Sequence, residues 1–154
     1  MHNLVKYPGL IILIASVTSC LSAQAIKIFI NLLRFRKLDF KTMIRTGGMP
    51  SSHSAMVSSL ATGIALVEGV NSAVFDLAIV FALIVMYDAS GVRRSVGIQA
   101  GILNKMINEM TLDNPQLQLE RIKEFIGHTP YEVFAGALFG IGMGFLFCHQ
   151  FVAQ

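Results

Sequence analysis

The sequence predicts an all-α protein, a polytopic membrane helix bundle with about four transmembrane helices and one or two interfacial amphipathic helices. Of its 154 residues, 54% are apolar and only 14% are charged, and the mean hydropathy is +0.64. A soluble domain normally carries about 25% charged residues, so this chain lacks the polar residues needed to cover a water-facing surface. It shows no internal repeat, and residues 1–154 are treated as one integral membrane domain.

Four apolar segments are long enough to span a bilayer, which requires about 20 residues. The first is Gly9–Ile26, which continues into 28–33. The second and third, Ser51–Val70 and Asn71–Ser90, form a helical hairpin around a short turn, and the last is Thr129–His149. The first segment also imitates a secretory signal peptide. We expect it to be retained, because its removal would leave three spans and the apolar pattern continues beyond the apparent cleavage site.

Ten basic residues lie in two segments that these spans place on one side of the membrane, out of twelve in the chain. They are Arg34, Arg36, Lys37, Lys41, Arg45, Arg93, Arg94, Lys105, Arg121 and Lys123. The positive-inside rule makes this side cytoplasmic. Spans two, three and four each have one end there, so residues near 53, 88–94 and 128–132 are expected to converge on this face.

The region between spans three and four is predicted to be helical rather than a simple loop. Apolar residues recur every four positions from Ile98 to Met110, which indicates an amphipathic helix that continues span three or lies along the interface. Thr111–Pro115 breaks this helix. Gln116–Ile126 is interpreted as a second, shorter amphipathic helix.

The segment 47–54, Gly-Gly-Met-Pro-Ser-Ser-His-Ser, predicts a tight turn followed by a helix that Ser51 or Ser52 caps. Such a start points free N–H groups and the positive end of the helix dipole into the turn, beside Arg45 and His53. This arrangement suits a phosphate or another oxyanion, and a histidine there can transfer protons near neutral pH. The motif alone agrees equally well with a capped membrane helix that carries an incidental histidine.

The segment 127–132, Gly-His-Thr-Pro-Tyr-Glu, fits a capping box, with Thr129 as N-cap and Glu132 three residues later. In one interpretation, the carboxylate serves only the helix. In the other, Glu132 reaches the ring of His128, fixes its tautomer and makes it a better nucleophile, as in enzymes that form covalent phosphohistidine. A second histidine and several arginines on the same face favour the functional interpretation.

Adjacent arginines at 93 and 94 are candidates for binding an anion, since the planar guanidinium suits phosphate oxygens. Neighbours on a helix point about 100° apart, so one of Arg93 and Arg94 should face the site fully. Asp88, about one turn earlier, could orient an arginine through an ion pair. Ordinary basic flanking of a membrane span is the alternative.

These residues resemble the type 2 phosphatidic-acid phosphatase family, which is related to vanadium-dependent haloperoxidases. The segment 50–53 is similar to that family's Pro-Ser-Gly-His motif, His128 with Glu132 resembles its nucleophilic His-x-x-x-Asp, and Lys41 with Arg45 resembles its leading Lys…Arg pair. The motifs Gly-Gly-Met-Pro-Ser-Ser-His, Tyr-Asp-Ala-x-Gly-Val-Arg-Arg and Gly-His-Thr-Pro-x-Glu-Val, in this order, resemble its small divergent branch.

The chain departs from the common family pattern in several ways. Phe125-Ile126-Gly127 stands where the family has Ser-Arg shortly before the nucleophilic histidine, and glutamate replaces aspartate at 132. Four spans are also fewer than the six that are usual among membrane members.

The resemblance implies metal-independent phosphate hydrolysis in two steps. His128 would attack phosphorus and form a phosphohistidine, with Glu132 as its partner, and His53 would protonate the leaving group. The phosphate oxygens would be held by Lys41, Arg45, Ser51, Ser52 and Arg93 or Arg94, with Asp88 in support. No cofactor is implied, and the chain shows no metal-ligand spacing, Walker loop or dinucleotide fingerprint.

The expected substrate is a phosphorylated lipid (phosphatidic acid, phosphatidylglycerophosphate or an isoprenyl phosphate or diphosphate) at the cytoplasmic face of a bacterial plasma membrane. The alternative is a non-catalytic protein that binds or transports such lipids with the same anion pocket. The basic residues are few and lie near the membrane interface, which favours anionic lipid over nucleic acid as a partner. The sequence leaves open whether the chain acts as a monomer or a homodimer.

Overall fold

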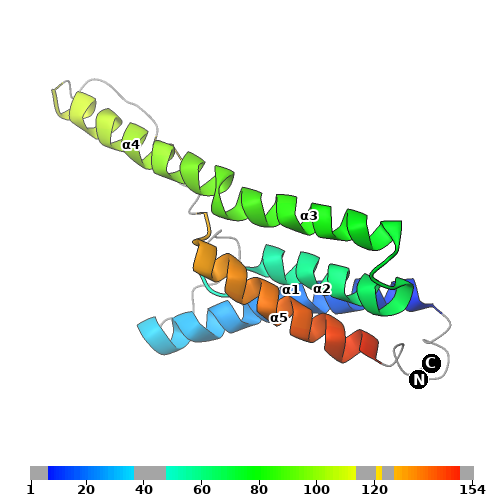
Figure 1. Ribbon diagram of the computed structural model, residues 1–154. Helices are drawn as coiled ribbons and strands as arrows, with labels where there is room; N and C mark the ends of the chain where they lie inside the picture. Colours follow the sequence, from blue (N-terminus) through cyan, green and yellow to red (C-terminus); the bar gives the residue numbers. More distant parts are fainter. Residues whose placement is uncertain (1–6, 37–47, 114–120, 123–126, 150–154) are drawn as a thin grey trace.

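The computed structural model describes residues 7–36, 48–113, 121–122 and 127–149, and within these ranges it contains helices and no strand. The helices are α1 (Pro8–Phe35), α2 (Ser52–Glu68), α3 (Ala73–Ser90), α4 (Val92–Asp113) and α5 (Pro130–Cys148). Helices α1, α2, α3 and α5 form a bundle, while α4 leaves it as a continuation of α3 (Figure 1). The predicted all-α bundle is confirmed.

Within the described residues, three stretches are long and apolar enough to cross a membrane: Pro8–Leu33, Ala73–Leu112 and Pro130–Cys148. The second joins α3 to α4, so the predicted amphipathic helix continues span three. The expected span Ser51–Val70 corresponds to α2, whose 17 residues extend about 25 Å at 1.5 Å per residue. Helix α2 is thus shorter than those stretches, and it packs against α1, α3 and α5.

Helices α2 and α5 approach closely because α5 carries glycines at four-residue spacing on one face. A Cβ atom at Gly136, Gly140 or Gly144 would collide with a backbone oxygen of α2 or its cap. The oxygens concerned belong to Ser51, Ala55 and Ser59. Small residues at this spacing are typical of tightly packed membrane helices, and here they hold the start of α5 against the start of α2.

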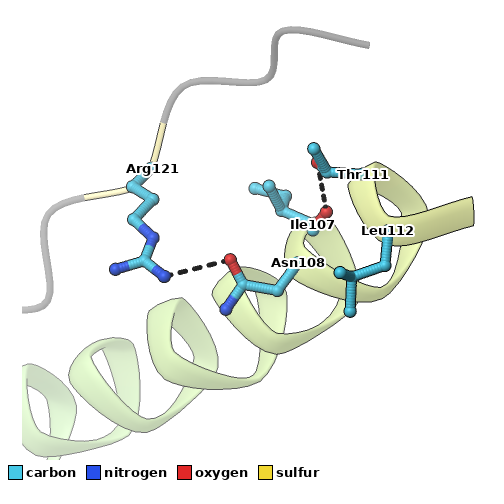
Figure 2. Close-up of a pocket in the computed structure, with 5 residues that line it drawn as sticks. All are labelled: Ile107, Asn108, Thr111, Leu112 and Arg121. Atoms are coloured by element: carbon cyan, nitrogen blue, oxygen red, sulfur yellow. Dashed lines mark hydrogen bonds between the residues drawn. The ribbon is translucent and has the colours of Figure 1, made fainter. Parts of the chain in front are cut away.

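Outside the bundle, α4 is joined to the segment 121–122 by reciprocal hydrogen bonds. The Asn104 Nδ2 donates to the Ile122 carbonyl, and the Ile122 N–H donates to Asn104 Oδ1, both at 2.8 Å. An open cavity of about 440 Å³ lies farther along α4 (Figure 2), with the lining residues Ile107, Asn108, Thr111, Leu112 and Arg121. It is about four turns from the α3–α4 junction, and neither His53 nor His128 lines it.

The predicted second amphipathic helix, 116–126, falls largely outside the described residues. Of that segment only Arg121 and Ile122 are described, and they are not helical.

Candidate active site

Four helix ends meet at one end of the bundle, where α3 ends and α2, α4 and α5 begin (Figure 1). Two backbone hydrogen bonds join these ends. The His128 N–H donates to the Ala89 carbonyl at 2.9 Å, and the Ser51 N–H donates to the Glu132 carbonyl at 3.0 Å. Residues that the sequence places near 53, 88–94 and 128–132 therefore do lie together.

His128 lies just before α5 and is nearly fully buried, with 1% of its surface exposed. Its Nδ1 is 3.0 Å from Glu132 Oε2. A carboxylate only accepts hydrogen bonds, so it selects the tautomer in which Nδ1 carries the proton. The lone pair of Nε2 is then available for chemistry.

Glu132 performs both of the functions that the sequence presents as alternatives. Its Oε2 accepts a hydrogen bond from the Thr129 N–H at 3.1 Å, and the Thr129 hydroxyl oxygen accepts one from the Glu132 N–H at 3.4 Å, which completes the capping box. The same Oε2 contacts His128. Because the cap already holds the carboxylate at the helix start, it presents an oriented acceptor to the ring of His128.

His53 lies in the first turn of α2 and faces His128, with 6.5 Å between the ring centroids and 66° between the ring planes. Ser51 caps this helix, since its Oγ accepts a hydrogen bond from the Ser54 N–H at 3.4 Å. Ser51 and Ser52 are buried. The N–H groups of Ser52 and His53 have no acceptor within the helix, as is usual for the first turn.

Arg93 and Arg94 differ in their positions. Arg93 pairs with Asp88 at 2.9 Å and remains partly exposed, and its charge acts on both histidines. Arg94 is exposed, and its backbone packs so closely on Gly127 that a Cβ there would collide with it. Arg93 is therefore the arginine whose charge acts on the two histidines.

The electrostatic surroundings favour the neutral form of His128. Burial lowers the pKa of its ring from the ordinary value of 6.5, and the charges of Lys27 and Arg93 act in the same direction. The hydrogen bond to Glu132 and its negative charge oppose this shift. A neutral imidazole with an unprotonated Nε2 is the form that a nucleophile requires.

Lys27 is a site residue that the sequence patterns did not reveal. It lies within α1 and is buried, with 4% of its surface exposed. Its charge acts on both histidines, and the charge of Glu132 acts on Lys27. The signal in the sequence was a lone lysine inside an otherwise apolar span, since ionisable residues within membrane spans usually have a function.

Two predicted phosphate ligands, Lys41 and Arg45, lie outside the described residues. Among the residues that the structure describes, no group of three or more histidine, cysteine, aspartate or glutamate side chains is arranged to hold a metal ion.

Comparison with known proteins identifies the family of this chain. A family model described as the divergent PAP2 family matches residues 10–143. The uncharacterized membrane protein YuiD of Bacillus subtilis (strain 168) is 39% identical over 162 aligned positions, which cover 99% of this chain and all of YuiD. No solved structure matches. The chain belongs to the divergent PAP2 family, as its motifs predicted.

Proposed function

We propose that this member of the divergent PAP2 family is an integral-membrane lipid-phosphate phosphatase that works through a phosphohistidine. The main support is the 3.0 Å bond from His128 to Glu132, opposite a second histidine at 6.5 Å. A phosphoryl group between the two rings would have a nucleophile on one side and an acid on the other. In-line displacement at phosphorus requires this arrangement.

In the first step, the lone pair of His128 Nε2 attacks phosphorus and the P–O bond to the lipid breaks. His53, protonated beside the bound phosphate dianion, donates its proton to the leaving oxygen. In the second step, His53 removes a proton from water, which attacks phosphorus and breaks the P–N bond. Inorganic phosphate leaves, and both rings return to their starting states.

Charge on the transferred phosphoryl group needs fixed positive partners, which are worth most in a site of low dielectric constant. Arg93 is the described arginine best positioned for this task, with Asp88 holding its guanidinium. The N–H groups of Ser52 and His53 add the positive end of α2. We assign Lys41 and Arg45 to the same task on their resemblance to the family's leading pair.

The proposed location is the cytoplasmic face of a bacterial plasma membrane. The ten basic residues on that side support this orientation. Phosphatidic acid, phosphatidylglycerophosphate and isoprenyl phosphates are the candidate substrates, because each combines a phosphate with a membrane-soluble chain.

The test is phosphate release by the purified protein from each lipid in mixed micelles, with a metal chelator present. Release should be lost in His128→Ala and retained in His149→Ala, whose side chain is exposed at the opposite end of α5. Radiolabelled phosphate should be trapped on the wild type as an acid-labile adduct. Undiminished release by His128→Ala would remove this residue from the mechanism. Lipid binding by the wild type without release would instead support the non-catalytic alternative.

A further inference from the structure

Lys27 lies on the buried face of α1. Ser19, Ala23 and Lys27 recur every four residues, and all three are buried, so they share one face of the helix. The Ser19 hydroxyl donates to the Ala55 carbonyl of α2 at 3.1 Å. Lys27 lies two turns farther along α1, beyond that contact and toward the start of α2, where His53 is located.

The turn before α2 lies over the Lys27 side chain. A Cβ atom at Gly48 would be 3.9 Å from Lys27 Cδ, and Gly48 has a φ of +84°, which favours glycine. This turn leads into Ser51, the N-cap of α2, so the contact brings the Lys27 side chain to the end of α2 that carries His53. The charge of Lys27 acts on both histidines from there.

Lys27 has no hydrogen bond or ion pair within the part of the chain that the structure describes. A buried charge without a close partner is costly. A protein keeps such a costly charged residue where the charge binds a ligand. An ionisable residue in a membrane span is therefore a candidate functional residue.

We propose that the Lys27 ammonium binds the substrate phosphate from the α1 side, opposite Arg93, and so completes the positive lining between the two histidines. The inference rests on the proposed function for its substrate, but it concerns binding of the phosphate dianion itself. A buried cation beside a second, partly exposed one suits a terminal phosphomonoester, which has two negative charges and no second ester group.

A purely structural explanation would make Lys27 the counter-ion of Glu132. Removing the charge from the empty protein has opposite consequences under the two explanations. A counter-ion stabilises the empty protein, so Lys27→Met would lower its melting temperature. A ligand-binding charge destabilises the empty protein, so the same variant should melt at an equal or higher temperature without phosphate.

The experiment measures the melting temperature of the full chain in detergent as a function of inorganic phosphate concentration. The wild type is compared with Lys27→Met, Lys27→Arg and the matched control Lys105→Met, whose residue is exposed on α4. We expect the phosphate dissociation constant to rise about 10- to 150-fold in Lys27→Met, the range for loss of a hydrogen bond to a charged group. It should rise less in Lys27→Arg and stay unchanged in Lys105→Met.

Unchanged phosphate affinity in Lys27→Met would overturn the inference. A marked drop in the phosphate-free melting temperature of Lys27→Met, or failure of the variant to fold, would also overturn the inference and support the counter-ion explanation. Absence of phosphate binding by the wild type would also overturn it. Phosphate binding that depends on Lys27, in a protein that releases no phosphate from lipids, would uphold this inference while the proposed hydrolysis fails.

Discussion

Replacing Glu132 with glutamine separates its catalytic contribution from its contribution to helix capping. Glutamine also fits a capping box, so its amide oxygen can still accept from the Thr129 N–H, a bond of 3.1 Å in the native protein. The substitution removes the negative charge beside His128 Nδ1, 3.0 Å away. That charge matters most when attack on phosphorus leaves the imidazole ring positive.

A hydrogen bond to a charged group contributes about 1.5–3 kcal/mol, and each 1.36 kcal/mol corresponds to tenfold in rate. We therefore expect kcat to fall about 10- to 150-fold in Glu132→Gln. Because the cap is largely retained, the loss of stability should stay below about 0.5 kcal/mol. For a chain of this length that corresponds to a change in melting temperature of less than about 2 °C.

The matched control is Thr129→Ala, which removes the 3.4 Å bond that the Thr129 hydroxyl accepts from the Glu132 N–H and leaves the carboxylate in place. Loss of a cap costs about 0.5–2 kcal/mol, so this variant should melt about 1–8 °C lower with kcat close to normal. The assays are phosphate release under saturating lipid and thermal unfolding in the same detergent. Near-normal kcat with a lowered melting temperature in Glu132→Gln would refute the reasoning and show that Glu132 only caps α5.

The geometry supports three more predictions. The pKa of His128 is lowered from 6.5 and only the neutral ring attacks, so the acidic limb of the kcat/KM profile that reports this ring should lie below pH 6.5. A His128-dependent limb at higher pH would contradict the burial argument. Single cysteines at Ser95 and Asn71, in a background without other cysteines, should label from opposite sides with an impermeant thiol reagent, and labelling of position 95 from outside intact cells would reverse the orientation. Gly140→Leu should abolish the close approach of α5 to α2 and lower the yield of folded protein, whereas Gly142→Leu, where a Cβ meets nothing within 4 Å, should be tolerated; equal tolerance of both would argue against the glycine packing.

Several features of the site could be predicted because they depend on local pattern or on the parity of membrane crossings. An apolar composition requires membrane helices, and an even number of crossings returns His53 and His128 to one face. The capping box at 129–132 is predicted by residue types at fixed spacing, and the structure contains it. The Asp88–Arg93 ion pair was likewise anticipated from helical spacing, and it is present.

Other features depend on how the helices pack, and spacing alone carries no information about them. The sequence presents Glu132 as either a cap or a partner of His128, and only the fold reveals that one carboxylate oxygen serves both. It offers two equivalent arginines, and only the structure reveals that Arg93 is the one that pairs with Asp88 and acts on both histidines.

Composition, charge asymmetry and short motifs are all properties of the linear chain. They were enough to identify the class of protein, the end of the helices where the polar residues gather and the family to which the chain belongs. The presence of Lys27 at the site, in contrast, depends on the face that α1 turns toward α2, which is a property of the packed bundle. The Ser19–Ala55 contact joins that face to α2, and the turn at Gly48 then lies against the Lys27 side chain although the two residues are far apart in sequence.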